Sequence, residues 1–444
     1  MTPGLTRYVD VASRFQARDT ATTPAWLQRV RQEGLAHFAR LGLPTTRDEA
    51  WKYTNLAPIA DGAFVPSATA GSTAELAAVV ARLALPGPRL VFVDGRLSPE
   101  LSSVAGLPRG LTLKPLRDAL VEDGALLEAE LGQRALAAEH AFTALNAALL
   151  EDGAVLRLAP GALSEVPVQL VFLTRGDAPV LASPRILVVA GEGSEATLVE
   201  TYASATGGGS GQGFTNAVTE VTLGDNASLK HYRLQAEGDA AVHVGGLHVR
   251  QGCDSRFVSH TFAFGGVLAR NEVHVTFAGE GGDATLNGLY VGRGTQHLDQ
   301  RTALDHAVPR CTSRELYKGV LDDRARGTFH GLVKVRQDAQ RTDSRQQNRN
   351  LLLSEHAQAD TRPQLEILAD DVKCAHGAVV GRLDAQALFY LRSRGIPRAE
   401  AERLLTYAFA RELVDAVPEG PVRASVEGLL APKLPGSPRT EVTA

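Results

Sequence analysis

Two residues near the end of the chain have the types and the spacing to bind a metal ion. Cys374 and His376 lie in the run Lys373-Cys374-Ala375-His376-Gly377, with one residue between them. If this run is extended, side chains two residues apart project from the same face, about 6–7 Å from each other. A thiolate and an imidazole would then lie side by side, and Lys373 would favour the thiolate. Two ligands do not complete a metal site, so other ligands would have to come from elsewhere in the chain or from a second protein. A buried cysteine beside a solvated histidine is the alternative.

The rest of the sequence offers little support for hydrolytic or group-transfer chemistry. It contains no G-x-S-x-G, H-E-x-x-H or C-x-x-C motif. The glycine-rich stretch Gly207–Gly213 lacks the Gly-Lys-Ser/Thr of a P-loop, so it is predicted to be a loop, and no nucleotide is expected on this chain. Histidines without metal-site spacing are predicted to be polar surface residues of strands: His243, His248, His297 and His306.

The composition argues against nucleic acid as a partner. The net charge is −4, and only 5% of the residues are aromatic, which leaves few platforms for stacking bases or sugars. The segment Arg336–Asn350 is rich in Arg, Gln and Asn. Given the net charge, we expect it to be a solvated face with amide ladders between stacked coils.

The composition also predicts a cytosolic protein. No run of about 18 apolar residues could span a membrane, and Met1–Asp10 lacks the plan of a signal peptide. Cys253, Cys311 and Cys374 are far apart and odd in number, so a disulfide framework is not expected.

The elements that must position Cys374 and His376 are short predicted strands between Ala154 and Leu368. These segments are four to eight residues long, rich in Val, Leu, Phe and Thr, and bounded by Gly, Asp, Asn or Pro. They include Ala154–Leu158, Val168–Leu173, Ile186–Val189, Val218–Leu223, Val242–Val249 and Val273–Phe277.

These strands recur with a regular period. A small residue follows an acidic or amide residue at 196, 227, 255 and 284, and a degenerate copy lies at 313, which gives steps of 31, 28, 29 and 29. A period of this size, without a helical pattern between the strands, indicates a solenoid of stacked β-coils. Small residues suit the corners of such coils. An ordinary β-sandwich with evenly spaced strands is the alternative.

Helical patterns flank this core, so we expect three regions: a mixed helical region at 1–150, the β-core at 151–378 and a helical region with a tail at 379–444. In the first region the expected elements are helices at Pro24–Leu41 and Thr73–Leu85, and a helical stretch at Leu116–Leu150 that is broken near Gly124 and Gly132. A strand is expected at Leu90–Val93, and a capped helix or loop at Arg47–Leu56 that packs Trp51 and Tyr53 on a neighbour.

The last region is predicted to contain a helix at Asp384–Gly395 and a second helix from Pro397 to Val417. The second helix has an apolar stripe that must be covered by the last coil or by a partner. Beyond Pro418 the chain is predicted to be a frayed tail. The stripe comprises Ala401, Leu404, Leu405, Ala408, Phe409 and Leu413.

The order of several motifs resembles the SufB/SufD family of iron–sulfur cluster assembly proteins. Within the family the chain resembles the SufD branch, because of Arg47–Thr54 and Lys373–Gly377. Further motifs in the family's order are Phe142–Ala148, Arg345–Ser354, Pro363–Ile367 and Phe389–Ile396. Together the matches extend from Arg47 to Val414.

The resemblance implies a right-handed parallel β-helix core with helical N- and C-terminal regions. It also implies that the chain pairs with a SufB-like subunit and binds a SufC-like ATPase through its C-terminal helices. A transient iron ion or iron–sulfur cluster would lie at the interface with the SufB-like subunit, where Cys374 and His376 would be this chain's contribution. In isolation, the chain could form a homodimer.

The sequence therefore predicts a scaffold subunit of a SufBCD-type complex rather than an enzyme. A β-helix enzyme that acts on polysaccharide is the alternative, although the chain lacks abundant aromatic residues and an export sequence. An interaction scaffold without a metal role is a third interpretation.

Overall fold

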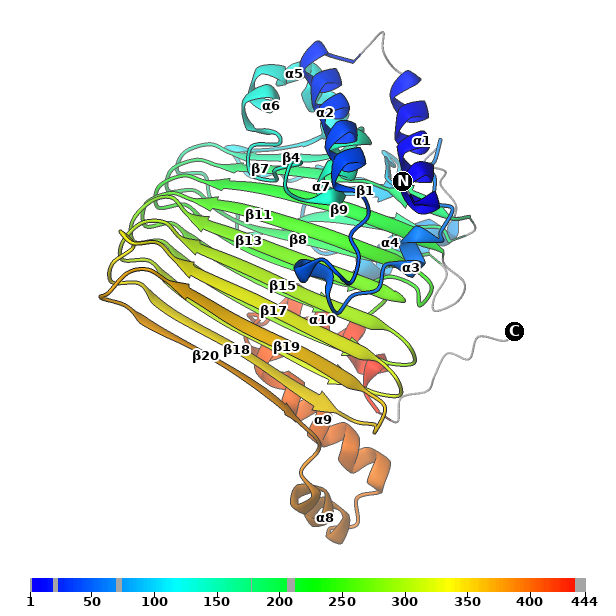
Figure 1. Ribbon diagram of the computed structural model, residues 1–444, viewed down its shortest axis with the longest axis vertical. Helices are drawn as coiled ribbons and strands as arrows, with labels where there is room; N and C mark the ends of the chain where they lie inside the picture. Colours follow the sequence, from blue (N-terminus) through cyan, green and yellow to red (C-terminus); the bar gives the residue numbers. More distant parts are fainter. Residues whose placement is uncertain (1, 19–22, 69–73, 177, 206–211, 436–444) are drawn as a thin grey trace.

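The computed structural model describes all of the chain except residues 1, 19–22, 69–73, 177, 206–211 and 436–444. Most of the glycine-rich stretch that we predicted to be a loop therefore lies outside the described residues. The described part is a long stack of strands with helices at both ends of the chain (Figure 1).

Two sheets run the length of the stack. Sheet I contains, in order, β2 (Arg96–Leu97), β1 (Arg89–Val93), β5 (Val168–Thr174), β8 (Glu195–Ser204), β10 (Ser228–Ala236), β12 (Arg256–Ala263), β14 (Asp283–Gly292), β16 (Thr312–Leu321), β18 (Asp343–Leu352) and β20 (Lys373–Gly381). Sheet II contains β19 (Gln358–Ile367), β17 (Arg326–Val335), β15 (His297–His306), β13 (Leu268–Phe277), β11 (Val242–Gln251), β9 (Gly213–Leu223), β7 (Arg185–Ala190), β4 (Gly153–Leu158) and β3 (Leu111–Pro115), and β6 (Val180–Ala182) pairs with β9.

From β5 and β4 onward, each strand pairs in parallel with the strand one coil further along the chain. For example, β14 pairs with β16, and β15 pairs with β17. From β7 onward, the strand that follows in sequence lies in the other sheet, so the chain winds as a coil. The prediction of a parallel β-helix with helical flanks is confirmed, and the antiparallel β-sandwich is excluded.

The period seen in the sequence marks one corner of the coil. The small residues at 196, 227, 255, 284 and 313 are buried, and each lies within one residue of the start of a strand of sheet I. Asn226 and Asp254, which precede two of them, have φ values of 57° and 49°. Asn and Asp tolerate this left-handed conformation best among residues with a side chain, which explains the amide or acid before the small residue.

Helices cover the first coils of the stack. They are α1 (Pro3–Ala17), α2 (Ala25–Leu41), the 3-10 helix η1 (Glu49–Trp51), α3 (Ala57–Ala60), α4 (Ala74–Leu83), α5 (Leu116–Glu122), α6 (Gly124–Glu130) and α7 (Ala141–Ala148). Every residue of α7 is buried, between α2 and β9. Helix α1 was not predicted; Thr2 caps it, Pro3 occupies its first turn, and Tyr8 and Ala12 are fully buried.

The C-terminal helices are α8 (Ala385–Ser393), α9 (Arg398–Asp415) and α10 (Pro421–Leu430), followed by the 3-10 helix η2 (Ala431–Lys433). Helix α9 contacts β14 and β16 of sheet I, so the core covers part of the predicted stripe. Leu413 is buried in this contact, but Leu404 is 41% exposed. The prediction of a frayed tail was wrong for residues 421–433, because Pro421 starts a helix, as proline can at a first turn, and Leu430 is buried; the part of the predicted tail at 436–444 lies outside the described residues.

The side chains that face inward from both sheets fill the space between them, which we call the lumen. Its apolar core runs from Leu90 in the first coil to Ala369 in the last. The stack ends at β19 and β20, which are the edge strands of the two sheets. Among the described residues no further strand pairs with either of them, so this end of the lumen, which we call the open end, is uncovered.

Candidate functional site

Cys374 and His376 lie at the open end, on β20 (Figure 1). Their register partners on β18 are Ser344 and Gln346, which are buried and face the lumen. The two side chains therefore project from the same, inward face of the edge strand, as their spacing predicted. Cys374 is partly buried against the lumen core, whereas His376 is exposed. The thiol and the imidazole are thus available to a molecule that covers the open end.

The electrostatic prediction for the cysteine was wrong. Lys373 pairs in register with Asp343 and lies on the opposite face of the strand from Cys374. Burial raises the pKa of the Cys374 thiol, although the backbone N–H of Ser344 acts in the other direction. The isolated chain therefore favours the neutral thiol, and a bound cation would have to displace its proton.

A second layer of polar residues lies directly beneath this pair. Ser313 Oγ donates to Ser344 Oγ at 2.8 Å. Gln346 Nε2 donates to the Glu315 carboxylate. Burial raises the pKa of Glu315 to about 7, and no cation pairs with it in the described part of the chain. The sequence analysis did not place this layer inside the core. The signal for it was a hydroxyl or amide residue at every second position of β18: Ser344, Gln346, Asn348 and Asn350.

No group of three or more His, Cys, Asp or Glu side chains in the described ranges could hold a metal ion. Cys374 and His376 therefore do not form a complete site within the residues described. A metal-binding role would require ligands from a partner at the open end.

The open end also exposes apolar side chains. Val380 on β20 is 44% exposed and Leu368 after β19 is 63% exposed, whereas Phe389 and Tyr390, 74% and 57% exposed, belong to α8, beyond the strands. Unpaired strand edges together with exposed apolar residues favour association with another chain.

The prediction for the strand histidines was wrong, because three of the four are buried. His243 and His306 face the lumen, where His243 Nδ1 lies 2.8 Å from Glu237 and His306 Nε2 lies 3.0 Å from Ser313 Oγ. His248 is buried on the outer face of sheet II, where its ring stacks on that of His274. His297 is half-buried.

The middle of the lumen contains a buried ionic cluster. Arg233 Nη2 lies 3.0 Å from Glu200 Oε2, His231 lies 3.2 Å from the other oxygen of Glu200, and Tyr202 donates to the same carboxylate at 2.8 Å. The Arg233 guanidinium, together with the hydrogen bond from His231, holds the pKa of Glu200 well below its ordinary value despite its burial. Because the cluster is enclosed, it stabilises or specifies the core and does not face a substrate.

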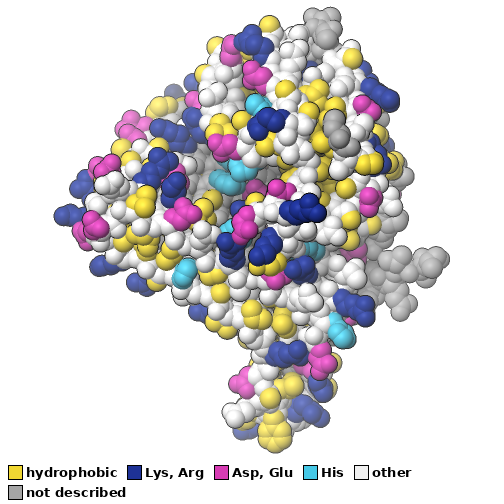
Figure 2. Space-filling model, viewed as in Figure 1, with side chains coloured by type: hydrophobic (Ala, Val, Ile, Leu, Met, Phe, Trp, Pro, Cys, Tyr) yellow, Lys and Arg dark blue, Asp and Glu magenta, His cyan; other side chains and the backbone are white. Residues whose placement is uncertain are grey.

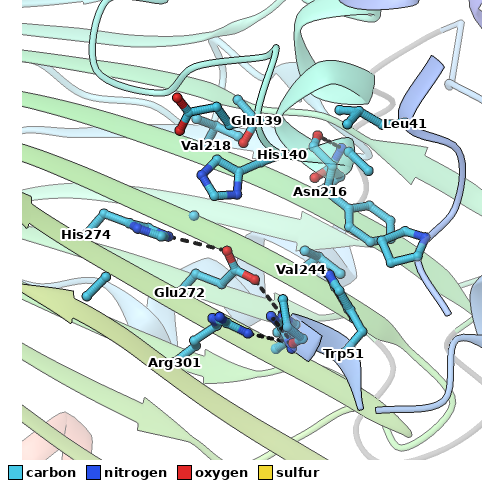
Figure 3. A pocket seen from close by; sticks show the side chains of 18 of the residues that line it. Leu41, Trp51, Glu139, His140, Asn216, Val218, Val244, Glu272, His274 and Arg301 are labelled. Atoms are coloured by element: carbon cyan, nitrogen blue, oxygen red, sulfur yellow. Dashed lines mark hydrogen bonds and ion pairs between the residues drawn. The ribbon is translucent and has the colours of Figure 1, made fainter. Parts of the chain in front are cut away.

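A hollow of about 470 Å³ lies on the outer face of sheet II, under the segment that carries Trp51 (Figures 2 and 3). Trp51 is buried against Phe142, and the Arg270 guanidinium lies 3.6 Å from its ring centroid, so the predicted packing role of Trp51 is confirmed. Glu272 and His274 line the hollow, but Glu272 is already paired with Arg270 at 2.6 Å. The Glu272 carboxylate is therefore already neutralised by an ion pair, and the hollow does not present a free set of metal ligands.

The prediction for Arg336–Asn350 is confirmed only in part. Arg345 and Arg349 on β18 face solvent. Asn348 and Asn350 instead face the lumen, where Asn350 donates to Asn348 at 2.7 Å and the Tyr290 hydroxyl donates to Asn350 at 2.5 Å. The amides thus form a buried network rather than a solvated ladder.

Comparison with known proteins assigns the family. The model described as the SUF system FeS cluster assembly, SufBD core domain, matches residues 172–409, and the SufBD protein N-terminal region matches residues 5–170. The chain is 34% identical to the iron–sulfur cluster assembly protein SufD of Escherichia coli over 96% of both chains. It is 29% identical to the protein of the same name from Bacillus subtilis, over 93% of this chain and 94% of the relative. The chain therefore belongs to the SufBD family of iron–sulfur cluster assembly proteins and is similar to SufD members of that family over nearly its whole length.

Proposed function

We propose that this chain is a cytosolic scaffold subunit, without catalytic activity of its own, of a SufBCD-type complex for iron–sulfur cluster assembly. The observation that carries the proposal is the position of Cys374 and His376. They lie side by side on β20, whose outer edge is unpaired at the open end. Iron or a nascent cluster is the cargo of this site, held transiently between the chain and its partner.

The partner at the open end is a SufB-like subunit. Two unpaired strand edges and exposed apolar residues support pairing at this end. The incomplete ligand set of this chain also supports a shared site, since the partner would supply the remaining ligands. When the partner is absent, a second copy of the chain could cover the same end as a homodimer.

A SufC-like ATPase binds the C-terminal helices. Helix α8 has no buried residue, and Phe389 and Tyr390 lie exposed on it. A cavity of about 340 Å³ between α9 and α10 is lined by Leu404, Tyr407 and Leu434 among others. Such exposed apolar surface is typical of protein–protein contacts. Nucleotide hydrolysis then belongs to the ATPase, in line with the absence of a P-loop sequence from this chain.

Polysaccharide chemistry is not favoured. The curated relatives are named as iron–sulfur cluster assembly proteins. The ionic cluster of the lumen is enclosed and has no access for a sugar chain.

Co-purification with the SufB-like and SufC-like proteins of the same organism tests the two contacts. Val380→Asp places a charge at the open end and should abolish co-elution with the SufB-like subunit, whereas Phe389→Asp should release only the ATPase. Val121→Asp is the matched control, because Val121 is 86% exposed in the N-terminal region. Normal co-elution of both variants would contradict the assigned surfaces.

A further inference from the structure

Gln346 occupies the position directly beneath His376. The two residues are register partners in neighbouring parallel strands, β18 and β20, and both face the lumen side. Side chains in such a pair stack at the spacing of neighbouring strands, about 4.8 Å. Gln346 is fully buried, so its amide is closed off from bulk solvent and must find its partners within the lumen.

The orientation of the Gln346 amide is determined by Glu315, one coil further in. Glu315 accepts a hydrogen bond from Gln346 Nε2, and both residues are buried. The structure places the NH₂ group of the amide toward Glu315, and the ionised form of this carboxylate, which only accepts, holds the amide in that orientation. The carbonyl oxygen, Oε1, is then left as a buried acceptor, and it has no hydrogen-bond partner among the residues described.

Gly331 on β17, across the lumen, leaves the space that the amide occupies. A Cβ atom at position 331 would lie 2.2 Å from Gln346 Nε2 and 2.9 Å from Oε1. The amide is therefore enclosed between Gly331 and Glu315, and it cannot turn freely to satisfy its oxygen elsewhere. A buried acceptor without a hydrogen bond is destabilising, so a donor within reach should bind it.

We propose that Gln346 is a positioning residue for His376: its Oε1 accepts a hydrogen bond from one ring nitrogen of His376 and thereby directs the other nitrogen outward. Histidines that bind metals commonly donate their second N–H to an oxygen in this way, which fixes the tautomer and the ring orientation. Glu315 acts through Gln346 by holding its amide. The role in cargo binding rests on the proposed function, but the hydrogen bond itself does not.

Two buried hydroxyls are competing donors: that of Thr302, the register partner of Gly331, and that of Thr361. Thr361 lies on β19 at the same end, and its Oγ1 is buried with no hydrogen-bond partner among the residues described. If Thr361 satisfied Gln346, the His376 ring would be independent of the glutamine. Thr361→Val, which preserves shape and removes the hydroxyl, is therefore the matched control.

The test is hydrogen exchange of the histidine ring N–H protons in the full chain labelled with ¹⁵N-histidine, with His376→Ala used to assign the signal. Gln346→Met keeps the length of the side chain and removes the acceptor, so the His376 ring N–H should exchange at least about tenfold faster. Thr361→Val should leave the exchange rate unchanged. The double variant Glu315→Gln with Gln346→Glu exchanges donor and acceptor, presents a carboxylate oxygen to His376, and should restore slow exchange.

Equal exchange rates in the wild type and Gln346→Met would overturn the proposal, as would equal acceleration by Thr361→Val, since both would show that Gln346 does not hold the ring. In the complex with its partners, Gln346→Met should lower iron retention by about 10–100-fold. If the wild-type complex holds no iron while the exchange result stands, the proposed function fails and the positioning role survives.

Discussion

Glu315 makes stability depend on pH in a direction that is unusual for a carboxyl group. Burial raises its pKa from 4.5 to about 7, and its hydrogen-bond donor is the neutral Gln346. Between these values the folded chain binds more protons than the unfolded chain, so the free energy of unfolding should fall as pH rises. At about 1.36 kcal/mol for each pKa unit, the full loss is about 3 kcal/mol above pH 7.

Glu315→Gln removes this titration and keeps an acceptor for Gln346. We expect the variant to be more stable than the wild type by up to about 3 kcal/mol at pH 8 and to approach the wild type near pH 4.5. Urea unfolding followed by circular dichroism at several pH values measures the difference. Glu355→Gln, at an exposed position, is the control. A difference that does not grow between pH 5 and pH 7.5 would refute the view of Glu315 as an unpaired buried carboxyl.

Further substitutions test the packing. Leu413→Ala should cost about 2–5 kcal/mol in unfolding free energy, because α9 anchors there on sheet I, while Leu404→Ala should cost little; thermal unfolding compares the two. Glu200→Gln leaves Arg233 buried without its counter-ion and should lower the free energy of unfolding by about 3–5 kcal/mol. The same thermal unfolding measures it, and an unchanged stability would show that the cluster is solvated. Gly331→Ala should cost about 1–3 kcal/mol and accelerate ring exchange at the open end, whereas unchanged stability would mean that the Gln346 amide moves freely.

The repeat made the β-helix predictable from sequence. The composition of the strands predicted a coil, and the recurring small residue predicted where the coil turns its corner. The corner could be recognised because the left-handed backbone conformation at Asn226 and Asp254 restricts the residue type there. The prediction of a frayed tail failed at residues 421–430 for a physical reason. Proline and glycine after Pro418 were interpreted as helix breakers, but Pro421 follows Gly420 at a helix start, where proline is favoured.

The candidate site was predictable only at its surface. The spacing of Cys374 and His376 is a local property, and from it the sequence analysis predicted that the two side chains project from the same face of a strand. The burial of His243, His248 and His306, and the layer of Glu315 and Gln346, depend on which strands become neighbours about thirty residues apart. Polar residues on strands indicate a surface unless the register that brings their partners together is known.

Iron and acid-labile sulfide in the anaerobically purified complex test the central claim most directly. The wild-type complex with its SufB-like and SufC-like partners would be compared with His376→Ala and Cys374→Ser, and with His356→Ala as an exposed-histidine control. The account predicts that the first two variants lose iron while the complex stays intact, and that the control retains it. Unchanged iron in both variants would contradict a ligand role for this chain and would leave the cluster chemistry to its partner.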